Sequence, residues 1–223
     1  MRASCWIPTV WLAAVAVFAG DREAWSPLFN GHNLDGWVQR GGQAIYRVEE
    51  GQIVGRAVPG TPNSFLCTTR SYRDFVLELE FKPMSGLNSG IQIRSECFDT
   101  PRTHQLGGKE YRIPAGRVHG YQIEIDPSER AWTGGIYEEG RRGWLVDLKE
   151  NEPARKAFKP NDWNHFRIEC RGDSIKTWLN GVLAAELNDG VTPEGFIALQ
   201  VHGVGNRTDP LEVRWRNLRI QEW

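Results

Sequence analysis

Short apolar runs separated by turn residues are the feature that most constrains how this chain can fold. The runs are rich in Val, Ile, Phe, Tyr and Trp, and several of them alternate apolar with polar residues. A period of two is typical of β-strands that bury one face, and no long segment carries the 3.6-residue period of an amphipathic helix. The clearest strands are predicted at 75–81, 90–94, 121–126, 165–170, 174–179, 182–187, 196–202 and 213–220.

Two turn signals indicate how some of these strands connect. Asn180-Gly181 lies between two apolar runs, and both residues tolerate the positive φ that a two-residue hairpin requires. Arg171-Gly172-Asp173 also separates two runs, and we interpret it as a hairpin turn rather than a cell-adhesion tripeptide. With no internal repeat or linker, so many strands predict an all-β fold, a two-sheet antiparallel jelly-roll sandwich that forms one domain over residues 20–223.

The N-terminus has the composition of a signal peptide. Arg2 supplies a positive charge, residues 7–18 form an apolar run that is short for a membrane span, and Ala19 fits a cleavage site. No cysteine follows the run directly, which argues against a lipoprotein anchor. We expect a signal peptide at residues 1–19 and a periplasmic or secreted protein that has no membrane segment after cleavage; an uncleaved anchor helix is the alternative.

Three cysteines lie beyond residue 19, namely Cys67, Cys97 and Cys170. An oxidising compartment allows one disulfide and one remaining thiol, and Cys67 to Cys97 is the pairing we expect. Buried unpaired thiols are the alternative. The spacing of the cysteines matches no zinc motif.

Charge and aromatic content narrow the range of functions. The formal net charge of -1 lacks the basic footprint of a protein that binds nucleic acid. The chain has 10 Trp, a residue that either fills a core or stacks on sugars and bases. Trp132 and Trp144 lie in the polar segment 127–159 and are the candidates for contact with a ligand. A second irregular stretch, 95–119, has the length of a functional loop.

Alternation places the polar residues of three predicted strands on one outer face. These residues are Gln92, Arg94, Gln122, Glu124, Asp126, Gln200 and His202. If the three strands are neighbours, the face combines carboxylates and an imidazole for proton transfer with Arg and Gln for holding hydroxyl groups, as a cleft for sugar chemistry requires. The alternative is a solvated sheet face with weak ion pairs such as Arg94 to Glu124.

Several motifs resemble one known family over residues 25–223. The segment 28–37, LFNGHNLDGW, resembles the opening of the 3-keto-disaccharide hydrolase family, and Gln200-Val201-His202-Gly203 is a second fairly specific match. Further matches occur in order at 88–94, 121–123, 134–137, 163–165, 178–181 and 216–218. The resemblance implies a concanavalin A-like jelly roll, often secreted, that acts on glycosides oxidised to a ketone at C3 of the sugar.

The chemistry implied by this resemblance follows from the ketone. A C3 ketone acidifies the proton at C2, so a base can remove it, the enolate is stabilised, the C1 substituent leaves, and added water completes net hydrolysis. Our hypothesis gives alternatives for each role: Glu124 or His202 as the base, Arg94 or a divalent metal ion for the enolate, and Tyr137 or His119 for the leaving group. The candidate substrate-binding residues are Gln92, Gln122, Asp126, Gln200, His119, Trp132 and Trp144.

One departure from the family pattern leaves the identity of the base open. Family members more often have Glu and then Gln in the strand that here carries Gln122 and Glu124. The segment 124–129 also resembles the E-x-D-x-x-E signature of laminarinase-like glucanases, in which Glu124 and Glu129 would be the catalytic pair. Pro127 argues against this alternative because it ends the strand and displaces Glu129.

Two further alternatives concern binding. The same sandwich serves as a non-catalytic lectin-like module, in which Trp132, Trp144 and Tyr137 would stack on a glycan. A divalent metal ion is an uncertain cofactor, for which Glu124, Asp126 and His202 are the candidate ligands, although they form no close ligand motif. The expected partner is an oligosaccharide or glycoside, not nucleic acid, and the oligomeric state is open.

Overall fold

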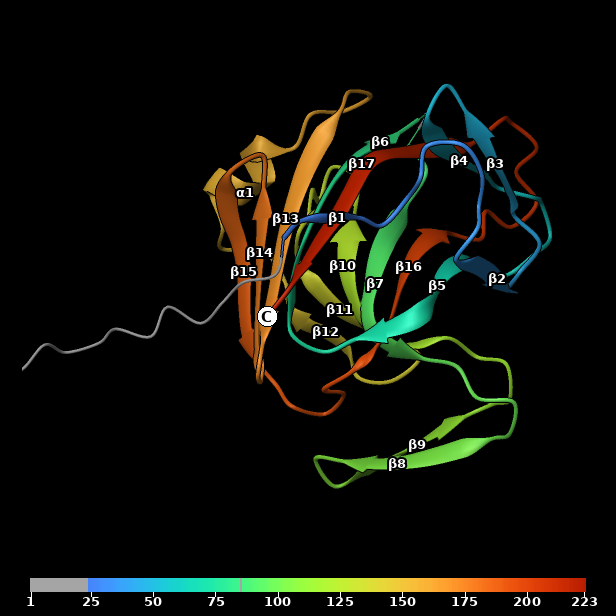
Figure 1. The fold of residues 1–223 in the computed structure, drawn as a ribbon. Helices are drawn as coiled ribbons and strands as arrows, with labels where there is room; N and C mark the ends of the chain where they lie inside the picture. The colour runs from blue at the N-terminus through green and yellow to red at the C-terminus, as the bar shows by residue number, and fades with distance from the viewer. Residues whose placement is uncertain (1–23, 85) are drawn as a thin grey trace, which may run out of the picture.

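The computed structural model describes residues 24–84 and 86–223 as two antiparallel sheets that face each other (Figure 1). The expected signal peptide, residues 1–19, lies outside the described residues. Within the described part of the chain, no helix has the length and apolar character needed to cross a membrane.

The two large sheets contain almost all of the strands. The eight-stranded sheet has the order β15 (Val182–Asn188), β14 (Ser174–Leu179), β13 (Asn164–Arg171), β6 (Phe75–Pro83), β17 (Glu212–Glu222), β4 (Gln52–Arg56) and β3 (Ile45–Glu49), with β1 (Ser26–Pro27) paired to β17. The seven-stranded sheet has the order β12 (Gly143–Val146), β11 (Ile136–Glu139), β10 (His119–Ile125), β7 (Ser89–Glu96), β16 (Gly195–Val201), β5 (Ser64–Tyr72) and β2 (Trp37–Gly41).

The all-β jelly-roll prediction is therefore confirmed, and each of the eight predicted strands is present with ends within two residues of those expected. Alternation is the reason: the inward residues of these strands form one core between the sheets, including Phe81, Phe166 and Trp215, all 0% exposed. Burying one face of each sheet against the other removes these side chains from water, which is the main stabilising contribution.

Both predicted hairpin turns are also confirmed. Asn180 and Gly181 have φ values of 50° and 84° between β14 and β15, as the two-residue turn requires. Gly172, with φ of 53°, turns the chain between β13 and β14. Its carbonyl oxygen accepts a hydrogen bond from Arg94 at 2.7 Å, which connects this exposed turn to the buried guanidinium of β7.

The stretch 95–119 is more regular than we expected. It contains β8 (Arg102–Leu106) and β9 (Lys109–Ile113), which pair only with each other and project from the sandwich as a hairpin (Figure 1). Four of its residues, His104, Leu106, Tyr111 and Ile113, are buried or half-buried and alternate with exposed ones, but so few of them give only a short and weak apolar signal of the pairing. The segment 127–159 likewise includes β11, β12 and the short helix α1 (Glu152–Ala157), whose first turn Asn151 caps.

The expected Cys67–Cys97 disulfide is absent, and Cys67, Cys97 and Cys170 are free thiols. Cys67 and Cys97 lie in a small second apolar cluster with Phe65, Val118 and Ala198. Burial raises the pKa of Cys67 to about 12, so this thiol is not a nucleophile at neutral pH.

Candidate functional site

The strands that carry the predicted polar face are adjacent in the seven-stranded sheet. β7 lies between β10 and β16. Gln92 of β7 is opposite Gln122 of β10 on one side and opposite Ala198 of β16 on the other. The inward residues Ile123 and Leu199 belong to the core, so their neighbours point outward as alternation predicted. The structure thus brings Gln92, Gln122, Glu124 and Gln200 together.

These side chains form a hydrogen-bonded chain, which we call the amide row, that ends at Glu124. Gln92 and Gln200 each donate to Oε1 of Gln122, at 2.6 Å and 2.8 Å. With its oxygen held by two donors, Gln122 turns its amide nitrogen toward Oε2 of Glu124, 2.8 Å away. Asn88 donates to the other carboxylate oxygen, Oε1, at 2.7 Å. The amide row therefore fixes the orientation of the carboxylate.

Glu124 is a buried carboxylate that reaches a pocket. The residue is 5% exposed, and burial raises its pKa because the charged form loses hydration. The hydrogen bonds from Asn88 and Gln122 oppose this shift without cancelling it. A positioned carboxylate with a raised pKa is suited to accept or donate a proton near neutral pH.

The polar pocket over Glu124 has a volume of about 320 Å³. It is lined by Asn63, Asn88, Arg117, Gln122, Glu124, Arg130, Tyr137, Glu139, Trp144 and His202. Several of the predicted site residues thus lie around one cavity, namely Gln122, Glu124, Tyr137, Trp144 and His202. The lining is mostly polar, as expected for a ligand that carries many hydroxyl groups.

Sequence reasoning missed a second carboxylate in this pocket. Glu139 lies on β11, 5% exposed, and Nη2 of Arg117 donates to it. Burial raises the pKa of Glu139, and the guanidinium of Arg117 opposes the shift. Alternation along β11 was the available signal, because Tyr137 and Glu139 are two residues apart and face the same side.

His202 follows β16 at the rim of the pocket and is exposed. Its Nδ1 lies 2.7 Å from the carbonyl oxygen of Gly203, which can only accept, so Nδ1 carries the proton. Nε2 of the neutral ring is then available as an acceptor. The histidine can serve as a base or as a hydrogen-bond partner for a ligand.

Aromatic side chains form one wall of the pocket. Trp144 lines it and contacts Tyr137 and Trp132 edge to face, with ring centroids 5.4 Å and 4.9 Å apart. Trp132 lies behind Trp144, and the guanidinium of Arg130 covers both indole rings. Of the two predicted stacking residues, Trp144 faces the cavity and Trp132 supports it. Burial raises the pKa of Tyr137, and the nearby Glu139 and Glu124 raise it further, so its phenol stays protonated at neutral pH.

Asp126 does not line the pocket, although it was predicted to share the polar face. Its carboxylate accepts from the backbone and hydroxyl of Ser128, from Nε of Arg130 at 2.7 Å and from the backbone of Trp132. Burial opposes ionisation, but the bonds from Ser128 and Arg130 outweigh it and lower the pKa of Asp126. The residue shapes the loop after β10, which ends at Ile125, and so positions Arg130.

Arg94 is a correction to the predicted site. It has φ of 43° at a bulge, where β7 has one residue more than β10 between Ile93 and Glu96. The bulge turns its side chain away from the polar face, so the guanidinium, fully buried, bonds to Asp74 and to the carbonyl oxygens of Arg73 and Gly172. Arg94 therefore ties the two sheets together at one end of the sandwich.

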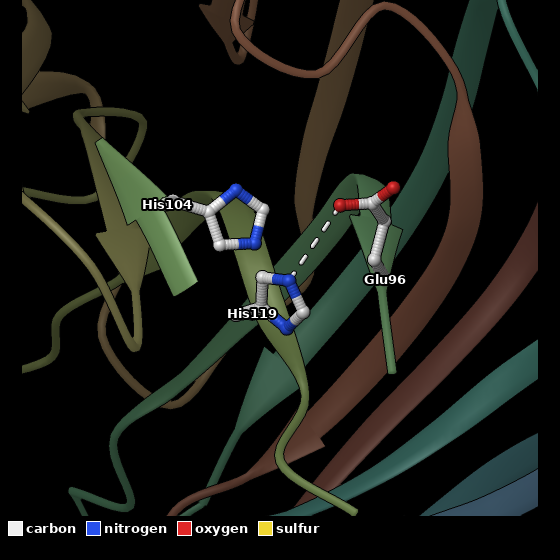
Figure 2. A group of neighbouring side chains, drawn as sticks. All are labelled: Glu96, His104 and His119. Carbon is white, nitrogen blue, oxygen red and sulfur yellow. Dashed lines mark ion pairs between the residues drawn. The ribbon is translucent and has the colours of Figure 1, made fainter. Parts of the chain in front are cut away.

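His119 is a second correction, because it is fully buried beyond the pocket, beside His104 and Glu96 (Figure 2).

The predicted metal ligands Glu124, Asp126 and His202 also do not lie together. Within residues 24–84 and 86–223, the single group of three ligand atoms within 4.8 Å of one another comes from Glu96, His104 and His119. The carboxylate of Asp126 is already used by its own loop.

The laminarinase-like pair is not assembled either. Glu129 lies exposed in the loop after β10 and does not line the pocket that contains Glu124.

A larger hollow of about 540 Å³ lies on the outer face of the eight-stranded sheet. Its carboxylates are neutralised, Glu78 by Arg219 and Arg167 and Glu80 by Arg216, so we assign the site to the smaller polar pocket.

Comparisons with known proteins identify the family of the chain and solved structures with a similar fold. Residues 24–221 match the family model described as a 3-keto-alpha-glucoside-1,2-lyase-like domain. No curated protein sequence matches the chain significantly.

Three solved structures illustrate the fold. A candidate glycosyl hydrolase from Parabacteroides distasonis is 23% identical, with a TM-score of 0.57 over 90% of this chain and 100% of that one. The carbohydrate-binding module CBM66 from Bacillus subtilis is 20% identical, with a TM-score of 0.57 over 84% and 96%. A protein with a galectin-like fold from Bacillus subtilis is 14% identical, with a TM-score of 0.60 over 91% and 96%. At these identities the likeness concerns the fold.

Proposed function

We propose, from the premise that the chain belongs to the 3-keto-alpha-glucoside-1,2-lyase-like family, that it cleaves glycosides that already carry a ketone at C3 of the sugar. The observation that carries this proposal is Glu124, a buried carboxylate with a raised pKa, oriented by two amide donors at a polar pocket. A base of this kind is what removal of a carbon-bound proton requires.

In the proposed reaction Glu124 takes the proton from C2, which the neighbouring C3 ketone has made acidic. The electron pair of the C2–H bond forms the enolate, then moves to make the C1–C2 double bond as the C1–O bond breaks. The phenol of Tyr137 donates its proton to the departing oxygen, since its raised pKa keeps it protonated. The products are an unsaturated keto-sugar and the free alcohol.

The enolate oxygen needs positive charge or hydrogen-bond donors near it. We assign this role to Arg117 and Arg130, the guanidinium groups that line the pocket, in place of Arg94. Arg117 is held by Glu139, and Arg130 is held by Asp126. Both cations are thus positioned before a substrate arrives, which lowers the reorganisation needed in the transition state.

Water determines whether the overall reaction is an elimination or a hydrolysis. Addition of water across the double bond of the unsaturated product restores a 3-keto sugar, and elimination followed by addition is net hydrolysis. His202 at the rim, with Nε2 available as an acceptor, is suited to activate that water. We therefore propose a 3-keto-glycoside lyase that also acts as a hydrolase when hydration follows at the same site. We further propose a cleaved N-terminal signal and a periplasmic or secreted location.

The test offers the purified protein a 3-keto-disaccharide and the unoxidised parent sugar, and measures release of the aglycone. We expect turnover of the keto-sugar alone, with loss of at least about 100-fold in Glu124→Gln, the range for removing a general base. Glu129→Gln is the matched control, because this exposed carboxylate follows Glu124 closely in sequence but lies outside the pocket. Turnover of the parent sugar, with loss in Glu129→Gln, would instead establish a laminarinase-like glucanase.

A non-catalytic carbohydrate-binding module is the second candidate, favoured by the similarity to CBM66 and by the aromatic wall at Trp144. It predicts saturable binding of an unoxidised oligosaccharide without turnover. Under this candidate Glu124→Gln would leave affinity nearly unchanged, while Trp144→Ala would weaken it. Calorimetric titration of the wild type and both variants separates the two candidates.

A further inference from the structure

Three potential ligands meet where the β8–β9 hairpin leaves the sandwich, and we call them the histidine cluster: Glu96, His104 and His119 (Figure 2). Glu96 is the last residue of β7, His119 is the first residue of β10, and His104 lies in the middle of β8. Each residue offers one ligand atom, and all three atoms lie within 4.8 Å of one another.

The tautomer of His119 leaves its inner nitrogen available. The residue is fully buried, and Nδ1 lies 3.1 Å from the carbonyl oxygen of Arg117. A carbonyl only accepts, so Nδ1 carries a proton, and Nε2 is the ring nitrogen that faces the other two residues. Nε2 points toward Oε2 of Glu96 at 3.5 Å, but no hydrogen bond satisfies it among the described residues.

His104 presents a similar unsatisfied atom. Its Nε2 is buried and has no hydrogen-bond partner within the described part of the chain. The ring packs edge to face on that of His119, with centroids 5.4 Å apart. Two buried nitrogens without partners beside one carboxylate are costly, because each has lost its bonds to water. A bound ion would satisfy both.

The chemistry of the three donors is suited to a divalent metal ion. Two imidazoles and one carboxylate form a ligand set typical of Zn²⁺ and related divalent ions. Bonds of about 2.0–2.1 Å in a tetrahedron place ligand atoms about 3.3 Å apart. The 3.5 Å between Nε2 of His119 and Oε2 of Glu96 is close to that value.

The charged groups around the cluster are Arg141 and its partner Glu138. The side chains of both are fully buried, with Nη2 of Arg141 3.0 Å from Oε1 of Glu138 and 2.7 Å from Oγ1 of Thr192. Glu138 also forms an ion pair with Arg142, which pairs in turn with Asp189.

We propose that Glu96, His104 and His119 bind one divalent transition-metal ion of the zinc class, which fastens the β8–β9 hairpin to the sandwich. The hairpin pairs with neither large sheet, and a two-stranded hairpin is marginally stable by itself. Phe98 contacts both His119 and Arg102, and Ile113 at the end of β9 is buried. The metal joins β8 to the ends of β7 and β10 and leaves a fourth coordination position for water.

This metal site is separate from the sugar pocket but touches it through Arg117. The carbonyl oxygen of Arg117 holds His119, while its guanidinium holds Glu139 in the pocket. The proposal does not depend on the reaction assigned to the pocket, because none of the three ligands lines it.

The test strips the purified full protein with a chelator and titrates it with ZnCl₂, following heat by calorimetry and competition with a chromophoric chelator. We expect one Zn²⁺ per chain and at least about 10-fold weaker binding in His104→Ala and in Glu96→Gln, in line with the loss of a ligand. His32→Ala is the control because His32 is exposed and distant in the fold, and it should bind like the wild type.

A second measurement addresses the hairpin itself. Zinc should slow amide hydrogen exchange at residues 102–113 in the wild type and in His32→Ala, but not in His104→Ala. His104 is on the projecting hairpin, so its replacement leaves the core intact, and unchanged thermal unfolding of the metal-free protein verifies this. Absence of zinc binding, or equal affinity in wild type and His104→Ala, overturns the proposal.

Discussion

Gly90 lies directly against the side chain of Gln122. A Cβ atom at position 90 would come within 2.6 Å of Cγ and Cδ of Gln122 and within 2.8 Å of its Nε2. That nitrogen is the one that donates to Glu124, whose Cα is the cross-strand partner of Gly90. The missing side chain on β7 is therefore what makes room for the amide row to reach the carboxylate.

The first prediction concerns this contact. Gly90→Ala should destabilise the protein by about 1–3 kcal/mol, the cost of overpacking, and should lower kcat/KM by displacing Gln122 from Glu124. In a Gln122→Ala background the added methyl has space, so the same change should cost much less. Unfolding free energies from urea titrations of the four proteins give the coupling. Equal costs in both backgrounds would show that the contact does not matter.

The second prediction is the pH dependence of the reaction. Since burial raises the pKa of Glu124, the acid limb of kcat/KM should lie above the ordinary value of 4.5. Asn88→Ala removes a donor that favours the ionised carboxylate, so the acid limb should move to higher pH, by about one unit. A profile that moves to lower pH, or stays in place, would argue against Glu124 as the base.

The third prediction links the same carboxyl to stability. A folded-state pKa above the unfolded value contributes stability that is full below the unfolded pKa and declines as pH rises through the folded pKa. The free energy of unfolding of the wild type should therefore fall relative to that of Glu124→Gln as pH rises above about 4.5. The slope with pH, measured by urea unfolding, is the quantity to compare, because any constant difference in hydrogen bonding cancels from it.

The fourth prediction separates Arg94 from the reaction. Arg94→Met should cost about 3 kcal/mol of stability, since it leaves Asp74 and two carbonyl oxygens without their buried partner. The folded fraction should retain its kcat/KM within about 2-fold, because the residue does not reach the pocket. Arg112→Met, at an exposed guanidinium of β9, is the control and should change neither quantity. A large loss of kcat in folded Arg94→Met would restore the residue to the site.

The fifth prediction distinguishes the two tryptophans. Trp144→Ala should raise KM by about 5-fold, since a stacked aromatic contributes about 1 kcal/mol, and should change kcat less. Trp132→Ala should affect KM less and thermal stability more, because Trp132 supports Trp144 from behind. Steady-state kinetics on the keto-sugar and thermal unfolding of both variants provide the comparison. A larger KM effect at Trp132 would reverse the assignment.

The sequence predicts the fold well because alternation is strong wherever a strand has one buried face. The same rule places Gln122, Glu124 and Gln200 on one surface, where the structure has them. The rule is less informative for β8 and β9, where only two residues of each strand are buried or half-buried, so the alternation is too short to separate this hairpin from an irregular loop.

The site residues that sequence reasoning missed share another physical cause. Arg117 and Asn88 lie just before strands, and Arg130 lies in the loop after one, so no periodicity marks their direction. Asp126 follows the last residue of β10, where the pleat no longer determines which way a side chain points. The predicted location of Arg94 differs from the structure for another reason, since one extra residue in β7 interrupts the alternation of the strand.

That extra residue has a consequence for how chains of this kind can diverge. The register of Tyr121 with Ile93 would, in an uninterrupted ladder, set Ser95 across from His119; the bulge sets Glu96 there instead. Deleting the residue at position 94 would restore a regular ladder, with Ser95 across from Gly120 and Glu96 still across from His119. The deletion would remove only the buried guanidinium that bonds to Asp74 and to the carbonyl oxygen of Gly172. A chain of this kind can therefore lose this connection between the two sheets through a one-residue deletion and still keep Glu96 beside His119.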